Sequence, residues 1–211
     1  MWLLDYECIP TYMEVECFYL KKQISNPNGF QDNTRLILRI ISKLEKGGYE
    51  EYEKLPTGQK VFWKDLMSHK KDLDLYPRIE GWTHWKIFMA EDENCNYYND
   101  IKECMGEKCP PMEELLDIYG KILTNTFQSD TGMGIFLSAS KLDHSCAPNC
   151  KDTLEGKDVV IKSSMPIEDF NDVRISYLSL AELSETTEER RQKLFDNYYF
   201  MCQCCKCINQ H

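Results

Sequence analysis

The stretch KLDHSCAPNC, from Lys141 to Cys150, places a histidine, a serine and two cysteines around a Pro-Asn turn. Three interpretations are open: His144 as a general base beside a nucleophilic Cys146, part of a metal site, or only a tight turn. We expect His144 and Cys146, which Ser145 separates, to be poorly placed for proton transfer from thiol to imidazole. The pattern therefore favours a metal site, and the other ligands must come from elsewhere in the chain.

The C-terminal stretch FMCQCCKC supplies such ligands within a few residues of one another. Cys202, Cys204 and Cys207 place three thiolates on a tight loop, and a structural zinc site takes four ligands in a tetrahedron. We therefore predict a closed, structural zinc site formed by Cys146, Cys202, Cys204 and Cys207. Cys205 leaves an alternative open, because Cys202-x-x-Cys205 is also a ligand spacing.

Composition limits the class of protein. The chain has 211 residues, 42% of them apolar, which is enough for a sizeable core, and no run approaches the roughly 18 apolar residues of a membrane span. The N-terminus, MWLLDYECIP, lacks the basic start and apolar stretch of a signal peptide, so we expect a cytoplasmic or nuclear protein. In that compartment clustered cysteines indicate metal rather than disulfides.

The net charge of −10 argues against direct binding to nucleic acid, which needs a cationic surface. It is compatible with a basic partner such as a lysine-rich protein tail, and equally with a role in solubility alone.

The order of predicted elements indicates an α+β fold. Helical periodicity predicts helices over 34–46, 61–73, around 82–90 and over 111–127. After Thr131 the short β-branched runs GIFLSA, VVIKSS and VRISYL predict strands. A last helix begins near Thr186, where Glu189 has capping-box spacing. The chain therefore runs from helices through a small β region to a cysteine-rich tail.

Three motifs carry a resemblance to a known family. GMGIFLSASKLDHSCAPNC, VRISYLSL and ERRQKLFDNYYFMCQCCKC resemble the second half of a SET domain with its post-SET tail, as found in SET-and-MYND-type protein-lysine methyltransferases. The resemblance covers residues 120–207 with distinctive motifs and 20–120 more loosely. In that family the cysteine of the HSC motif joins three tail cysteines on one zinc, which agrees with the ligand set predicted from spacing.

The resemblance also implies a division of the chain. Residues 1–19 resemble the end of a MYND finger, 20–120 a helical SET insert, 121–183 the C-terminal half of the core SET domain, and 184–211 the post-SET helix and zinc tail. Against the family pattern, we expect this stretch of sequence to lack the N-terminal glycine-rich SET strand, most of the MYND finger and the C-terminal helical domain.

The activity that the resemblance implies is methyl transfer from S-adenosylmethionine to a lysine amine of a protein, with histones as one candidate class. A free lysine has a pKa near 10.4, yet its amine must be neutral to react. A narrow apolar channel and the adjacent sulfonium both disfavour the charged amine, and aromatic walls tolerate a cationic methyl donor. No membrane partner is expected.

Site residues follow from the family motifs position by position. The resemblance makes Tyr177 the catalytic tyrosine and makes Phe127, Tyr177 and Tyr198 the walls of the substrate channel. The cofactor contacts that it implies are His69, Asn125, Asp143, His144, Tyr177 and Phe200. Ordinary core packing is the simpler explanation of Phe127 and Tyr198, and a surface or packing role is the simpler explanation of His69.

Two departures from the family pattern favour a different function. Asp143 replaces an asparagine, and a carboxylate only accepts hydrogen bonds, whereas an amide also donates them. Phe170 replaces a turn glycine, so a turn that needs positive φ would be strained there. The alternative is a non-catalytic, zinc-stabilised SET-like adaptor that binds peptides or proteins through the groove that holds the substrate in the enzymes of the family.

Overall fold

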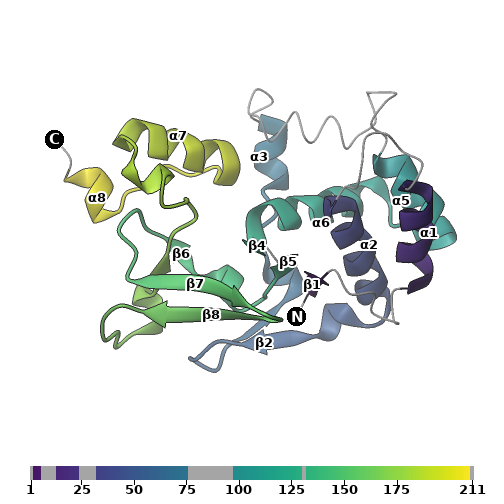
Figure 1. The fold of residues 1–211 in the computed structure, drawn as a ribbon, viewed down its shortest axis with the longest axis horizontal. Helices are drawn as coiled ribbons and strands as arrows, with labels where there is room; N and C mark the ends of the chain where they lie inside the picture. The colour runs from purple at the N-terminus through teal and green to yellow at the C-terminus, as the bar shows by residue number, and fades with distance from the viewer. Residues whose placement is uncertain (1, 6–12, 24–31, 76–96, 130–131, 210–211) are drawn as a thin grey trace.

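The computed structural model describes residues 2–5, 13–23, 32–75, 97–129 and 132–209. Helices α1, α2, α5 and α6 lie together at one end of the molecule, and the β7–β8 hairpin lies with α7 and α8 at the other (Figure 1). This is the mixed α+β arrangement that the sequence predicts. The helix expected around 82–90 lies outside the described residues.

The helical end forms the main hydrophobic core. Its helices are α1 (Met13–Gln23), α2 (Asp32–Glu45), α5 (Tyr97–Met105) and α6 (Met112–Asn125). Leu36, Ile37, Ile40 and Ile41 of α2 are fully buried, which confirms the predicted apolar face. Helix α2 begins two residues before Thr34, so Thr34 is a buried helical residue and not the cap that its type indicates.

The prediction of a helix over 61–73 is wrong for most of that range. The chain forms strands β2 (Tyr52–Lys54) and β3 (Lys60–Phe62), a 3-10 turn over Trp63–Asp65, and only then helix α3 (Lys70–Leu75). Gly58 has a φ of 87°, which lets the hairpin turn close. Val61 and Trp63, two residues apart, are both buried, which is the periodicity of a strand and not of a helix.

Three further small sheets complete the described fold. Strands β1 (Trp2–Asp5), β5 (Gly132–Ile135) and β4 (Thr126–Ser129) form an antiparallel sheet in the order β1-β5-β4. Strands β7 (Cys150–Glu155) and β8 (Asp158–Ser163) form a hairpin. Strands β6 (Asp143–His144) and β9 (Arg174–Ile175) pair in parallel, with Asp143 opposite Arg174. This last pair joins two segments about thirty residues apart and fixes the position of the DHSC motif.

Phe170 does not occupy a strained turn. It begins a 3-10 turn over Phe170–Asp172, and Asp169 accepts a hydrogen bond from the backbone nitrogen of Asn171. Among described residues other than glycine, only His69 and Tyr199 have positive φ. The expected conflict between Phe170 and a glycine-requiring turn is therefore absent.

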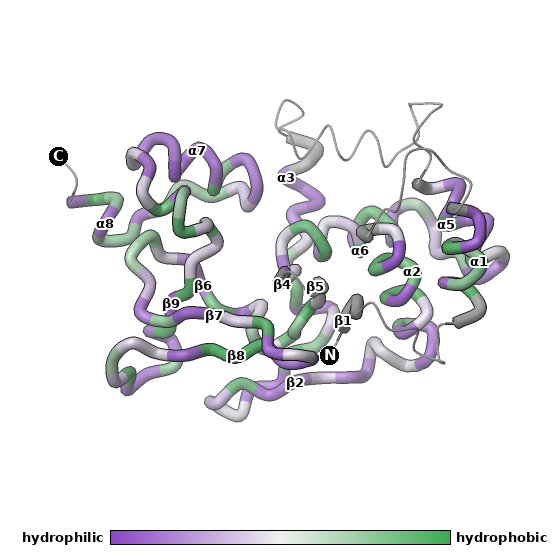
Figure 2. The backbone as a smooth tube through the Cα atoms, viewed as in Figure 1, coloured by the Kyte–Doolittle hydropathy of each residue, from purple (hydrophilic) through white to green (hydrophobic). Residues whose placement is uncertain are grey.

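Helix α7 (Thr187–Tyr198) leads the chain into the tail. Thr186 and Glu189 form the predicted capping box, with each side chain accepting a hydrogen bond from the backbone nitrogen of the other residue. Most of α7 is hydrophilic (Figure 2), in keeping with its place on the outside of the molecule. Tyr199 ends the helix with a φ of 58°, and the short helix α8 (Cys205–Ile208) follows. Within the described ranges, the helices are too short or too polar to cross a membrane.

Candidate functional site

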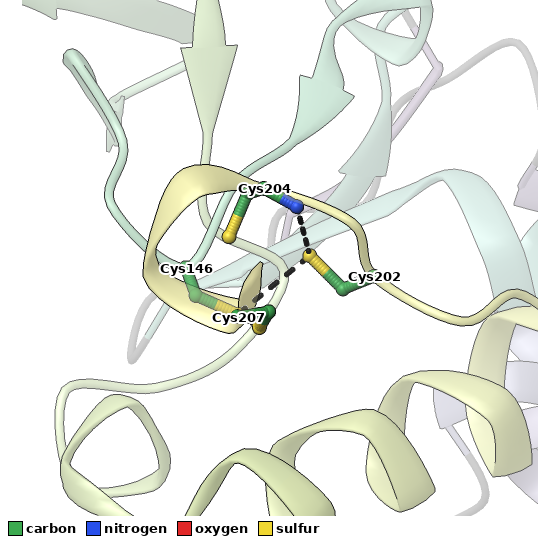
Figure 3. Close-up of side chains that lie close together, drawn as sticks. All are labelled: Cys146, Cys202, Cys204 and Cys207. Carbon is green, nitrogen blue, oxygen red and sulfur yellow. Dashed lines mark hydrogen bonds between the residues drawn. The ribbon is translucent and has the colours of Figure 1, made fainter. Parts of the chain in front are cut away.

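Four cysteine sulfurs converge at the end of the tail. The Sγ atoms of Cys146, Cys202, Cys204 and Cys207 all lie within 4.8 Å of one another (Figure 3). Cys146 Sγ is 3.9 Å from that of Cys202 and 3.5 Å from that of Cys207. A zinc–sulfur bond of about 2.3 Å in a tetrahedron requires sulfurs about 3.8 Å apart, so this cluster is compatible with zinc.

The backbone around the tail explains why Cys205 is not part of the cluster. Cys204 is the N-cap of α8, and the nitrogen of Cys207 donates to its carbonyl at 2.9 Å. One short helical turn therefore brings Cys204 and Cys207 to the same side and leaves Cys205 exposed. The alternative spacing Cys202-x-x-Cys205 does not match this arrangement.

Two arginines of α7 support the cluster. Arg190, which is fully buried, donates from Nη2 to the sulfur of Cys207 at 3.5 Å. Arg191 donates to the carbonyls of Cys202 and Cys207 at 3.0 and 3.3 Å. Burial raises the pKa of Cys204, but hydrogen bonds from the backbone of Cys146 and Cys207 outweigh burial and lower it to about 6. The cluster thus offers one thiol with a lowered pKa, and the charge of Arg190 stabilises anionic sulfur, which is the form that binds zinc.

His144 and Cys146 do meet, contrary to our expectation, because side chains two residues apart in an extended segment lie on the same face. His144 Nε2 lies 3.3 Å from Cys146 Sγ, where the chain leaves the two-residue strand β6. The backbone nitrogen of Tyr177 donates to His144 Nδ1 at 2.9 Å. Nδ1 is therefore an acceptor, and the neutral ring carries its proton on Nε2, which donates to the sulfur.

This tautomer argues against a base–nucleophile pair. Burial, followed by the charge of Arg190, lowers the pKa of His144 to about 4, and burial raises the pKa of Cys146 to about 12. A thiol with a high pKa, facing a ring nitrogen that is itself a donor, is not activated for attack. His144 instead connects the sulfur cluster to the backbone of Tyr177.

A cavity of about 530 Å³ lies beside this connection. It is lined by all six residues that the sequence analysis named as cofactor contacts, which are His69, Asn125, Asp143, His144, Tyr177 and Phe200. They come from the loop before α3, the end of α6, β6, the segment after β9 and the tail. Rings cluster on one side, where His144 lies 5.3 Å from Tyr177 and 5.9 Å from Phe200, centroid to centroid.

The insert wall of this cavity is held against α6 by main-chain contacts. Thr124 Oγ1 and Asn125 Nδ2 each donate to the carbonyl of Met67 at 2.7 Å. A methyl group on Gly120 would lie 2.2 Å from the carbonyl oxygen of Ser68, so α6 approaches the loop closely only because residue 120 is glycine. The insert loop therefore has one defined position, which places His69 on the cavity wall.

His69 is fixed from two further sides. Its Nδ1 lies 2.8 Å from a carboxylate oxygen of Asp72, and its ring centroid lies 5.1 Å from that of Tyr199. His69 and Tyr199 both have positive φ, at 51° and 58°. Non-glycine residues in this region are uncommon and are found where surrounding contacts determine the backbone, often at functional sites.

A second, smaller cavity of about 150 Å³ adjoins the first. It is lined by the three residues named as channel walls, Phe127, Tyr177 and Tyr198. Tyr177 and Tyr198 line both cavities, and their ring centroids are 4.8 Å apart. The phenol of Tyr177 donates to the carbonyl of Leu142 at 2.6 Å. Burial, and then the charge of Asp143, raise the pKa of Tyr177, so this phenol is neutral in the working range of a protein.

Sequence reasoning missed several wall residues. Asp65, Met67, Ser140 and Lys141 line the larger cavity, and Asp152 lines the smaller one. Ser140 and Lys141 directly precede the DHSC motif, so their position along the chain could have indicated them. No sequence signal marked Asp65, Met67 or Asp152.

Comparison with known proteins places this site in context. The chain is 30% identical over 205 residues to the histone-lysine N-methyltransferase SMYD3 of Homo sapiens, covering 92% of this chain and 43% of the relative. It is 29% identical over 185 residues to the N-lysine methyltransferase SMYD2 of Homo sapiens, covering 85% and 39%. A SET and MYND domain-containing protein of Dictyostelium discoideum is 42% identical over 76 residues.

No family model matches the chain. The chain spans less than half the length of the two human relatives. The similarity to SMYD3 and SMYD2 nevertheless extends over most of this chain, and the motifs that carry it converge on one pair of cavities and one sulfur cluster. The chain therefore belongs to the SET-and-MYND-type family.

Proposed function

We propose that the described cavities are the donor pocket and the lysine channel of an S-adenosylmethionine-dependent protein-lysine methyltransferase. The observation that carries the proposal is that Tyr177 and Tyr198 line both cavities. A methyl group passes directly from donor to amine, so the two sites must adjoin. The relatives are named as lysine methyltransferases, which supports the same reaction.

The larger cavity suits the donor in size and chemistry. Its volume of about 530 Å³ lies within the range of roughly 300–1,000 Å³ that is usual for small-molecule sites. The rings of Tyr177 and Phe200 offer π faces to a sulfonium, and the exposed Asp143 offers a carboxylate to an ammonium group. When bound, S-adenosylmethionine supplies an electrophilic methyl group on a positively charged sulfur.

Tyr177 orients the amine in this proposal. Its hydroxyl proton is directed to Leu142 O, so the phenol oxygen is left to accept a hydrogen bond from an amine N–H. Phe127 and Tyr198 surround the lysine side chain and disfavour its charged form. Alignment of the neutral amine is then the main contribution of these residues to the rate.

Zinc has a structural role in this proposal. Cys146 follows β6, whereas the other three ligands lie in the tail, so a bound metal ties the tail to the parallel β6–β9 pair. Tyr198 and Phe200 lie immediately before the tail ligands and reach the cavities from there. The substrate is a lysine-containing protein, with histones as a candidate class, in the cytoplasm or nucleus.

The test is transfer of labelled methyl from S-adenosylmethionine to a histone mixture, with the full zinc-loaded chain. Tyr177→Phe keeps the ring and removes the accepting oxygen, and we expect a loss of about 10²- to 10³-fold in rate, similar in size to the loss of one preorganised hydrogen-bond partner at a reacting group. Tyr52→Phe, an exposed tyrosine of β2, is the matched control and should retain full activity.

Equal rates for wild type and Tyr177→Phe would exclude the proposed role of Tyr177. No transfer by the wild type, with fold and zinc intact, would instead support the adaptor function.

A further inference from the structure

The smaller cavity contains one charged side chain. Among the described residues that line it, Asp152 is the only acidic or basic one. The others are apolar, aromatic, hydroxyl or amide residues. Asp152 is half-buried, so its carboxylate is available to a ligand in this small cavity.

The position of Asp152 on β7 directs its side chain toward this cavity. Side chains alternate along a strand, so Asp152 lies on the same face as Cys150, which is 6% exposed and packs in a core cluster. Opposite Asp152 on β8 is Ile161, and both Ile161 and Phe127 pack against that same cluster. The carboxylate therefore extends from the inner face of the hairpin, beside the channel wall formed by Phe127.

We propose that Asp152 is a specificity residue that binds the ammonium group of an incoming alkylammonium side chain, such as lysine or methyl-lysine. The inference rests on the proposed function, because it takes the smaller cavity as the entrance for the substrate. The aromatic rings of Phe127 and Tyr198 surround the alkyl chain, and Asp152 supplies the opposite charge.

This role is distinct from that of Tyr177. A nearby carboxylate favours the protonated amine, which cannot accept a methyl group, so Asp152 acts in binding and not in transfer. Tyr177 also lines the larger cavity. Its phenol acts on the amine at a later stage, when the amine has reached the donor pocket and is neutral. Asp152 should therefore affect KM, whereas Tyr177 should affect kcat.

The experiment measures binding of two probes to the full zinc-loaded chain by titration calorimetry or NMR. One probe is Nα-acetyl-lysine methylamide, and the other is the uncharged Nα-acetyl-norleucine methylamide. We expect the wild type to prefer the cationic probe. Asp152→Asn should weaken that probe by about tenfold or more, as for loss of a charged hydrogen-bond partner, and leave the neutral probe unchanged.

Two variants sharpen the result. Asp152→Glu should keep most of the preference, because it retains the charge. Asp158→Asn removes the same charge from an exposed position on β8 and should change neither affinity. Equal binding of the cationic probe by wild type and Asp152→Asn would overturn the proposal, as would equal loss of both probes or no saturable binding by the wild type.

The outcome separates this inference from the proposed function. Charge-selective binding that depends on Asp152, in a chain without methyl transfer, would support the inference and count against the enzyme. Methyl transfer with a KM that Asp152→Asn leaves unchanged would overturn the inference and leave the enzyme in place.

Discussion

The Nε2 atom of His144 lies 3.3 Å from the sulfur of Cys146, and the other ring nitrogen accepts the backbone N–H of Tyr177. One imidazole thus bridges a predicted zinc ligand and the predicted catalytic tyrosine. Removing the imidazole should therefore affect both the sulfur cluster and the backbone at Tyr177.

His144→Phe should therefore destabilise the protein while keeping an aromatic ring in place. The Tyr177 N–H would lose its partner, at a cost of about 1–3 kcal/mol for an unsatisfied, partly buried donor. A double-mutant cycle with Cys146→Ser, measured by urea unfolding, should give a coupling energy of about 0.5–3 kcal/mol. Additive effects would show that the two side chains do not interact.

Metal content tests the sulfur cluster. The purified chain should hold about one equivalent of zinc, and Cys204→Ser should lose it, because one of four thiolates is removed. Cys205→Ser is the matched control, since Cys205 is adjacent but exposed and outside the cluster. Loss of zinc in Cys205→Ser with retention in Cys204→Ser would show that the tail binds metal in the other register.

Gly120→Ala should destabilise the chain although it improves helix propensity. An alanine in α6 gains up to about 1 kcal/mol in propensity. The new methyl group would lie 2.2 Å from the main-chain oxygen of Ser68. A main-chain atom cannot move away by a change of rotamer, and overpacking of this kind costs about 1–3 kcal/mol. Thermal melts should show a lower Tm, and the affinity for S-adenosylmethionine should fall as the insert loop moves. A raised Tm with unchanged affinity would contradict the tight contact.

Thr186→Ala should cost about 1 kcal/mol of stability through loss of the N-cap of α7. The effect should depend on pH, because hydrogen bonds from the backbone and side chain of Thr186 lower the pKa of Glu189. A carboxyl group whose pKa is lowered by folding stabilises the fold at pH values above its unfolded pKa of about 4.3. This stabilisation is lost as the pH falls through the pKa of the folded state. The difference in Tm between the two proteins should therefore shrink below about pH 4, and a difference that grows there would refute the capping box.

Local signals in the sequence were sufficient for much of this structure. The apolar face of α2, the capping box at Thr186 and the CxCxxC spacing depend on residues close together in the chain, and all three are found. The hairpin at 52–62 was missed because a short apolar run fits a helix or a strand equally well, and the difference is decided by the Gly58 turn.

Long-range packing decides the rest. The hydrogen bond from the backbone nitrogen of Tyr177 to His144 follows from the pairing of β6 with β9, whose partner residues lie far along the chain. Asp152 faces a cavity because Phe127, in another sheet, packs against its strand. Neither relationship has a local signature, so neither could be predicted from spacing alone.

The sulfur cluster joins positions 56 to 61 residues apart in the sequence, and it exists only when the β6–β9 pair and the tail are both folded. A metal bound there is a ligand of the native state, so each tenfold rise in free zinc above its dissociation constant adds about 1.4 kcal/mol to the free energy of unfolding. The lifetime of the chain would then depend on the concentration of free zinc, because molecules without zinc unfold more often and are degraded first.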